Sequence, residues 1–125
     1  MFRLAIVSFM LVFFGIIEIQ ASEKSRTISE MLKLYSAGTS QYKIMNKLLI
    51  GKTGEALGWA NSKLRVDGRK ALYCPPEKLA MNHEQYLLML QNAVIKKPTL
   101  GSYPMNALGL IILEILIDTF PCPKH

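Results

Sequence analysis

The 125-residue sequence predicts an all-α fold, a compact bundle of four to five helices, on the basis of three observations. Apolar residues recur at helical spacing, and no stretch alternates apolar and polar residues in the manner of a strand. Helix-capping residues precede these stretches, and glycine or proline follows them. The sequence has two cysteines, Cys74 and Cys122, and one disulfide between them would link a Cys-Pro-Pro loop to the C-terminal end of the last helix.

Residues 1–21 have the pattern of a secretory signal peptide. Arg3 gives a positive start, residues 4–17 are small or apolar, and Ala21 completes a cleavage site. We expect cleavage after Ala21, because the apolar run is too short for a stop-transfer helix; retention as a membrane anchor is the alternative. The mature protein is then a single exported helical domain, residues 22–125.

Composition narrows the range of partners. Loss of Arg3 and Glu18 with the signal peptide leaves the formal net charge at +6, and the lysines are spread along the chain. A basic run suited to nucleic acid is therefore missing. The charge is explained either by a solvated lysine-rich surface or by an anionic partner, such as an acidic patch on a protein or an anionic envelope surface.

The cysteine pair is expected to stabilise the domain. In an exported chain of this size, two cysteines indicate a disulfide and not a metal site or a nucleophile. Joining Cys74 to Cys122 closes a loop of about 50 residues, which contributes about 4 kcal/mol to stability in the chain-entropy model. A domain this small has a marginal core without such a link.

The first helix is expected to begin at Ile28. Thr27 and Glu30 form a capping box before it, and Gly38 ends it as a C′ residue, a position that is usually left-handed. The apolar residues that predict its buried face are Ile28, Met31, Leu32 and Tyr35.

The second helix is expected to begin near Thr39 or Ser40 and to run to about Leu64. Three glycines share one side of it, and each costs about 1 kcal/mol relative to alanine. We therefore expect a close crossing with another helix backbone; a break near the first two glycines is the alternative. The glycines are Gly51, Gly54 and Gly58, and the expected inner face is Tyr42, Met45, Leu48 or Leu49, Ala56, Ala60 and Leu64.

A loop separates the second helix from the third. Asp67-Gly68 is a turn signal, and the prolines of Cys74-Pro75-Pro76 hold the backbone extended. Asn82 with Gln85 marks the start of the third helix, which is expected to stop at Lys97 before a proline. Its inward residues are expected to be Tyr86, Leu87, Leu90, Ala93 and Val94.

Residues 104–122 are expected to form the central core helix. They are apolar on nearly the whole circumference, apart from a stripe of Asn106, Glu114 and Asp118. The apolar part is shorter than the about 20 residues that a bilayer crossing requires. Pro104 is expected at the first helical position, and Phe120-Pro121-Cys122 ends the helix.

The sequence gives no positive case for an enzyme, a cofactor or a metal site. His83 is expected to be exposed in the first turn of the third helix, and Trp59 is interpreted as a core aromatic residue. Glu114 and Asp118 lie one turn apart, the spacing of paired catalytic carboxylates, but are interpreted as the polar edge of the core helix. An enzyme that uses these two carboxylates is a weaker alternative.

Binding is the remaining class of function, and one segment is a candidate contact surface. Prolines bracket it, which lowers the ordering cost on binding, and Leu100 and Tyr103 offer apolar anchors. The alternative is an ordinary connector in which these two residues cap the core. The candidate partner-binding residues are Lys96, Lys97, Thr99, Leu100, Gly101, Ser102 and Tyr103.

Three motifs are similar to those of one family. GEALGWAN at residues 54–61, LYCPP at residues 72–76 and FPCP at residues 120–123 occur in the order and spacing of the Rap/Tai immunity domain. The chain resembles this domain over roughly residues 27–123. The combination of Cys-Pro-Pro with a terminal Phe-Pro-Cys is the most specific part of the resemblance.

The resemblance implies a periplasmic immunity protein that binds and inhibits a peptidoglycan-cleaving amidase effector of type VI secretion. Such a protein blocks the cleft of the toxin, often as a homodimer, and protects the producing cell and its siblings. Many members carry a second cysteine pair between the first two helices; here Tyr35-Ser36 leaves the first helix held by packing alone. The alternative function is a periplasmic helical ligand-binding or stress protein without a toxin partner.

Overall fold

The computed structural model describes residues 25–124. Four α-helices, α1 (Ile28–Ala37), α2 (Ser40–Val66), α3 (His83–Lys96) and α4 (Leu108–Thr119), are accompanied by two short 3-10 helices, η1 (Pro98–Ser102) and η2 (Met105–Ala107). Within residues 25–124 there is no β-strand, only an isolated bridge between Thr27 and Pro104. The all-α prediction is confirmed, whereas the predicted signal peptide lies outside the described residues.

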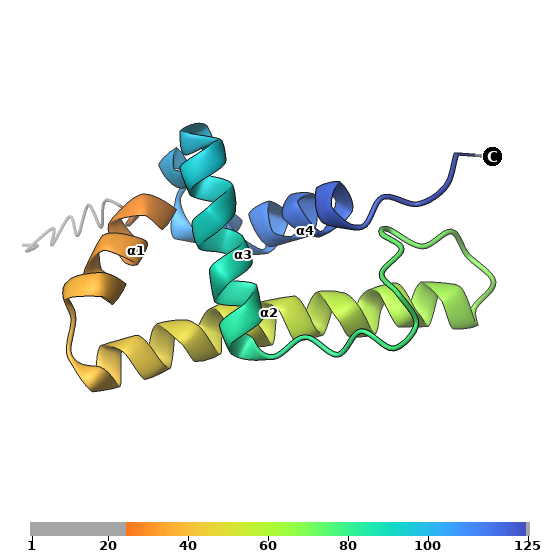
Figure 1. Ribbon diagram of the computed structural model, residues 1–125, viewed down its shortest axis with the longest axis horizontal. Coiled ribbons are helices and arrows are strands. Elements are labelled where there is room, and N and C mark those ends of the chain that lie inside the picture. The colour runs from red at the N-terminus through yellow and green to blue at the C-terminus, as the bar shows by residue number, and fades with distance from the viewer. Residues whose placement is uncertain (1–24, 125) are drawn as a thin grey trace, which may run out of the picture.

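The long helix α2 is the base on which the other elements pack. Figure 1 shows α3 crossing α2 near its middle and α4 lying on the same side of α2, toward its C-terminal end. α1 folds back over the start of α2, and residues 67–82, here called the returning loop, lead back along α2 to the start of α3. The contacts of α2 with α1, α3 and α4 agree with this arrangement.

The core lies where these helices meet. α4 supplies five of the buried apolar residues, and its predicted polar stripe, Asn106, Glu114 and Asp118, is exposed. The sequence therefore identified the buried and exposed faces of this helix correctly. The core consists of Ile28, Met31, Ile50, Tyr73, Tyr86, Leu87, Leu90, Leu100, Leu108, Ile111, Ile112, Ile115 and Leu116.

The core helix begins at Leu108 and not at Pro104, which corrects the sequence prediction. Pro104 has an extended backbone, with φ of −69° and ψ of 156°, and precedes the 3-10 helix η2. The chain around it pairs with the segment that precedes α1. Because such pairing requires an extended chain, the α-helix forms only beyond it.

The same pairing ties α1 to the rest of the molecule. Ile28 N donates a hydrogen bond to Tyr103 O at 2.9 Å, and Met105 N donates to Arg26 O at 2.8 Å. The expectation that packing alone holds the first helix is therefore wrong. Two backbone hydrogen bonds fix its start to the connection between η1 and η2.

Both predicted capping boxes are present and set the starts of two helices. In α1, Glu30 N donates to Thr27 Oγ1 at 3.2 Å and Thr27 N donates to the Glu30 carboxylate at 2.8 Å. In α3, Gln85 N donates to Asn82 Oδ1 at 2.9 Å and Asn82 N donates to Gln85 Oε1 at 2.8 Å. These bonds satisfy amide groups that the first turn of a helix leaves without partners.

Gly38 ends α1 in a different way from the one predicted. Its φ of −79° and ψ of 172° are extended, not left-handed. A β carbon at this position would lie 2.6 Å from Leu34 O and 2.9 Å from Tyr42 Cδ1. Glycine is therefore needed for the close passage from α1 to α2, and not for an unusual backbone conformation.

The second helix is continuous from Ser40 to Val66, which confirms the prediction of a single helix. Two of its glycines lie where α3 crosses: a β carbon at Gly51 would collide with the ring of His83, and one at Gly54 with the ring of Tyr86. The crossing is thus close, as predicted, but side chains of α3 and not its backbone fill the space. Gly58 lies outside it, because its nearest contact would be an ordinary 3.7 Å.

The predicted inner face of α2 is wrong for most of its residues. Met45 is 62% exposed, and Leu48, Leu49, Ala56 and Ala60 are also exposed. The close crossing explains the difference, since it needs the small residues of the helix to face inward. The residues of α2 that are buried are Ile50, Gly51, Gly54 and Asn61.

Candidate protein-binding groove

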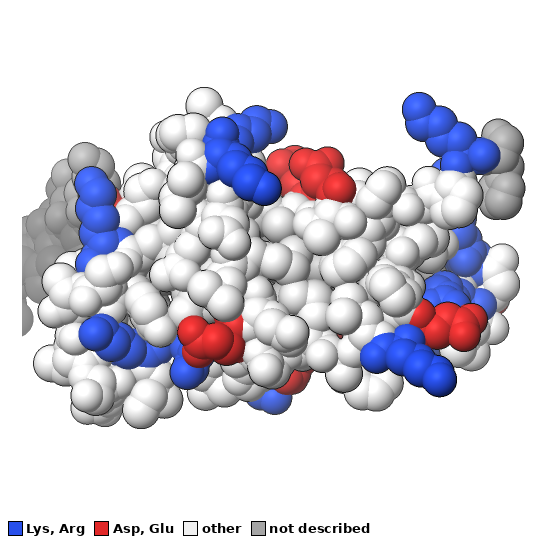
Figure 2. All heavy atoms as spheres, viewed as in Figure 1, with Lys and Arg blue, Asp and Glu red and all other residues white. Residues whose placement is uncertain are grey.

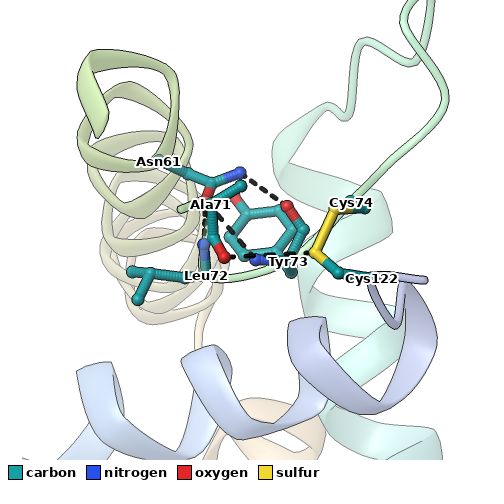
Figure 3. Close-up of a disulfide and its surroundings, with 6 residues drawn as sticks. All are labelled: Asn61, Ala71, Leu72, Tyr73, Cys74 and Cys122. Atoms are coloured by element: carbon teal, nitrogen blue, oxygen red, sulfur yellow. Dashed lines mark hydrogen bonds between the residues drawn. A yellow bond between two sulfur atoms is a disulfide. The ribbon is translucent and has the colours of Figure 1, made fainter. Parts of the chain in front are cut away.

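A single buried side chain attaches the returning loop to α2. Asn61 is 3% exposed, and its Nδ2 donates to Tyr73 O at 2.9 Å. Its Oδ1 accepts from Leu72 N at 2.7 Å and from Tyr73 N at 3.4 Å (Figure 3). One asparagine therefore satisfies three backbone groups of the loop, of which the two of Tyr73 are buried and that of Leu72 is partly buried.

The predicted disulfide between Cys74 and Cys122 is present, with the two Cα atoms 4.8 Å apart. Beside it, Cys74 N donates a hydrogen bond to Phe120 O at 2.8 Å. The returning loop is thus joined covalently to the segment that follows α4, next to the site where Asn61 holds it (Figure 3). A disulfide of this kind is compatible with export.

An open groove of about 430 Å³ lies beside this junction. The buried side chains at its bottom include Tyr73, Tyr86 and Leu116, and more exposed side chains form its edges. It is bounded by α2, the returning loop, the start of α3 and the end of α4. The residues that line the groove are Glu55, Gly58, Trp59, Asn61, Ser62, Arg65, Tyr73, Pro75, Leu79, Ala80, Met81, Tyr86, Leu116 and Phe120.

Trp59 stands at the edge of the groove and is 77% exposed. The interpretation of this residue as a core aromatic is therefore wrong. The reason is its place on the helix: it follows Gly58 and precedes Asn61 by two residues, so it lies outside the arc of α2 that faces α3 and the returning loop. An exposed tryptophan beside an apolar groove is typical of a protein-binding surface.

Two further edge residues have the character of a contact surface. Leu79 is 41% exposed on the returning loop, and Arg65 is exposed about 1.7 turns beyond Trp59 on α2. Tryptophan and arginine are the residue types most often found to dominate binding energy. The groove thus combines an apolar floor with the side chains that protein interfaces favour.

A polar cluster of Lys52, Glu55 and His83 lies at the crossing of α2 and α3, and Glu55 also lines the groove. His83 Nε2 lies 2.7 Å from Glu55 Oε1, and Lys52 Nζ lies 2.7 Å from Glu55 Oε2. These hydrogen bonds, from Lys52 first and then from His83, lower the pKa of the Glu55 carboxyl. The prediction that His83 is exposed is wrong: Gly51 leaves room for the ring, and His83 is half-buried against it.

Burial affects the two tyrosines at the bottom of the groove. Desolvation raises the pKa of both Tyr73 and Tyr86, and the charge of Glu55 raises that of Tyr86 further. Both hydroxyls therefore stay protonated in neutral solution. They are available as neutral hydrogen-bonding groups to a side chain that enters the groove.

The segment predicted to bind a partner forms the end of α3 and η1, and none of its residues lines the groove. Leu100 is 8% exposed and belongs to the core, so the alternative of a core-capping connector holds for this residue. Gly101 is also buried, and a β carbon there would collide with Ser29 Oγ. The residues that remain exposed are Lys96, Lys97, Thr99, Ser102 and Tyr103, and their role in binding stays a prediction.

The predicted polar edge of α4 also lies apart from the groove. Glu114 and Asp118 are both exposed, as expected, and neither lines the groove. Among residues 25–124, no three His, Cys, Asp or Glu side chains are grouped so that they could hold a metal ion. In the same range, no helix is both long and apolar enough to cross a membrane.

Sequence reasoning missed the groove because its lining comes from four segments that are separate in the sequence. One signal was present: a helical wheel of α2 with the glycines on the inside places Trp59 on the outside. The contribution of Leu79 and Met81 had no signal, because the path of the returning loop depends on the bonds at Asn61 and Cys74.

The three motifs of the Rap/Tai resemblance meet at this groove. The first motif contributes Trp59 and Asn61 to its lining, the second contributes Tyr73 and Pro75, and the third contributes Phe120. The disulfide between Cys74 and Cys122 joins the second motif to the third beside the groove. Residues far apart in the sequence thus form one local structure.

A comparison of the chain with protein-family models, curated protein sequences and solved structures gave no match in any of the three.

Proposed function

We propose that the protein is a periplasmic immunity protein that binds and inhibits a peptidoglycan-cleaving amidase effector of type VI secretion. By occupying the cleft of the amidase, it protects the producing cell and its siblings. The single observation that carries the proposal is the meeting of the three resemblance motifs around one groove with an exposed tryptophan. Motifs that only maintained a core would not need to leave Trp59 in solvent.

The way in which the groove is held supports a binding role. The Cys74–Cys122 disulfide and the three hydrogen bonds of Asn61 fix the returning loop before any partner arrives. A fixed surface loses little conformational entropy on association, so more of the contact energy remains as affinity. An inhibitor must bind tightly to a toxin, and a pre-ordered surface serves that need.

The direct test uses the product of the neighbouring gene, where a small cysteine-dependent amidase is expected. The purified, disulfide-bonded protein should form a stable complex with this amidase in size-exclusion chromatography. An equimolar amount should abolish the release of muropeptides from peptidoglycan sacculi. An amidase that cleaves equally well in the presence of excess protein would contradict the proposal.

Two variants locate the contact. Trp59→Ala should weaken the complex about thirtyfold, the effect of losing a central aromatic anchor. Leu88→Ala removes an apolar residue that is 49% exposed on α3 but does not line the groove, and it should leave affinity unchanged. A lipid or other apolar molecule that co-purifies with the protein, without any effect on a hydrolase, would instead favour the ligand-binding alternative.

We also propose that the protein forms a homodimer through a second surface, the outer α2 patch. Four apolar side chains on the N-terminal half of α2 are exposed, and they are Ile44, Met45, Leu48 and Leu49. Two lysines next to the patch are already paired, Lys47 with Glu84 at 3.0 Å and Lys52 with Glu55 at 2.7 Å. Two copies of a chain with a net charge of +6 repel each other. The repulsion is weakest where the cations are neutralised, so a contact between copies is favoured at this patch.

Sedimentation equilibrium tests this second proposal. The wild-type protein should sediment as a dimer at micromolar concentration, and Leu48→Glu should make it monomeric because a charge is buried without a partner. Leu88→Glu, an equivalent change outside the patch, should leave the dimer intact. A wild-type protein that remains monomeric would contradict the proposal.

A further inference from the structure

Four cations gather at the end of the molecule where α2 ends and the C-terminal segment lies. Figure 2 shows blue atoms at this end, on its right. All four side chains are exposed, and none of them forms an ion pair with a described carboxylate. We call this surface the basic end; its members are Arg65, Arg69, Lys70 and Lys124.

The basic end differs from three other lysines of the described chain, and it differs from Lys96 and Lys97, which also form no ion pair with a described carboxylate, in lying beside the groove. Lys47, Lys52 and Lys63 each lie within 3.0 Å of a carboxylate, so their charges are largely compensated. The basic end lacks such compensation, since Asp67 is already taken by Lys63. The carboxylates of the returning loop and α4 that form no ion pair in the described structure are Glu77, Glu114 and Asp118.

The cations lie on both sides of the disulfide junction. Arg65 lines the groove together with Trp59. Lys70 and Lys124 line a second hollow of about 620 Å³, which is bordered by Cys74 and Cys122. An apolar groove and a cationic hollow therefore flank the same disulfide.

We propose that the groove and the basic end together bind an acidic segment of a protein partner. An apolar or aromatic side chain of this segment enters the groove beside Trp59, and its carboxylates pair with Arg65, Lys70 and Lys124. The inference rests on the proposed function, because the segment would belong to the amidase, and it adds the chemistry by which the amidase is recognised.

Charge and shape together select this kind of partner. Unpaired cations attract an acidic surface from a distance and raise the rate of association. The apolar floor of the groove, with Tyr73 and Leu116 buried in it, can be reached only by a narrow element such as one side chain of a peptide. A flat membrane surface would contact the lysines but not this floor.

Trp59 provides a specific reporter, because it is the one tryptophan of the sequence. We would titrate the purified, disulfide-bonded protein with two fluorescence-silent peptides of equal length that share a central leucine. One peptide carries aspartate and glutamate around the leucine, and the other carries lysine. The acidic peptide should shift the emission of Trp59 to shorter wavelength and protect it from acrylamide quenching, whereas the basic peptide should do neither.

Charge-reversal variants test the assignment. Arg65→Glu combined with Lys70→Glu should lower the affinity for the acidic peptide about tenfold or more. Added salt should reduce the difference in affinity between this variant and the wild type. The matched control is Arg26→Glu combined with Lys33→Glu, which changes the net charge equally near α1 and should have little effect. Circular dichroism would establish that both variants keep the helical fold.

Three outcomes would overturn the inference. They are no binding of the acidic peptide at low salt, equal affinity for both peptides, and an equal loss of affinity for the acidic peptide in both double variants. A response of Trp59 only to vesicles of phosphatidylcholine and phosphatidylglycerol would also overturn it, in favour of a membrane surface. The amidase separates this inference from the proposed function. If wild type and the Arg65→Glu, Lys70→Glu variant inhibit the amidase equally, only the role of the basic end is contradicted. If the wild type does not inhibit the amidase, the proposed function itself is contradicted.

Discussion

The two halves of α2 are attached to the molecule by different means and present different surfaces. The N-terminal half is held by packing and by the ion pair of Lys47 with Glu84 of α3, and its exposed side is the apolar outer α2 patch. The C-terminal half is held by Asn61 and by the disulfide junction, and it exposes Trp59 together with Arg65, which forms no ion pair with a described carboxylate.

This comparison indicates that one helix can serve two kinds of contact. An apolar side suits a second copy of the chain, because the lysines next to it, Lys47 and Lys52, are paired with carboxylates. A charged surface with an aromatic residue suits a different protein of opposite charge. The covalent link lies beside the second surface, where the loop has no helix of its own to stabilise it.

Removal of the disulfide should have the largest effect. Cys74→Ser combined with Cys122→Ser should lower the free energy of unfolding by about 4 kcal/mol, since the unfolded chain regains the entropy of a loop closed over a sequence separation of 48. Urea unfolding followed by circular dichroism measures it. Addition of a reductant to the wild type is the control and should have the same effect; unchanged stability in both would show that the junction is not needed.

Replacement of the buried asparagine should have the next largest effect. Asn61→Ala leaves the buried backbone groups of Tyr73 and the partly buried amide of Leu72 without partners, which should cost about 2–3 kcal/mol in unfolding free energy. Asn46→Ala, which removes one hydrogen bond to Tyr42 O within the other half of α2, should cost about 1 kcal/mol or less. Equal losses in the two variants would contradict the difference between the halves.

The glycines of α2 give a matched pair of substitutions with opposite expected signs. Gly54→Ala should destabilise the protein by about 1–3 kcal/mol, because the new β carbon collides with the ring of Tyr86. Gly58→Ala should be neutral or stabilise it by up to about 1 kcal/mol, since alanine favours the helix and the nearest atom is 3.7 Å away. Thermal unfolding of both variants measures the difference, and equal shifts would contradict the position of the α3 crossing.

The sequence predicted well what depends on local signals. The capping boxes at Thr27 and Asn82 and the continuity of α2 follow from neighbouring residues, and the disulfide follows from the presence of one cysteine pair. Similar motifs occur in many proteins because they satisfy backbone groups within one turn. These predictions therefore needed no knowledge of the tertiary structure.

What could not be predicted depends on which elements meet. Pro104 remains extended because Arg26 and Ile28 pair with the chain beside it, and these residues lie almost 80 positions away. Met45 was assigned to the core because it is apolar, whereas the crossing selects glycines for the inner face. The position of Trp59 follows from that same selection, so one error about α2 also hid the groove.

The smallest expected effect is the pH dependence of the α2–α3 crossing. The pKa of Glu55 is lowered by hydrogen bonds from Lys52 and His83, so its ionised form is favoured in the folded state. The resulting stabilisation is fully present above the ordinary value of 4.5 and is lost as the pH falls below it. The change should be small because the pair is partly exposed to solvent.

Thermal unfolding between about pH 6 and about pH 3 would measure this contribution. The melting temperature of the wild type should exceed that of Glu55→Gln at the upper end of the range, and the two should converge at the lower end. Glu77→Gln, at an exposed glutamate outside any described ion pair, should leave the pH dependence of the wild type unchanged. A constant difference between the wild type and Glu55→Gln at every pH would mean that the shape of this side chain, and not its charge, holds α2 against α3.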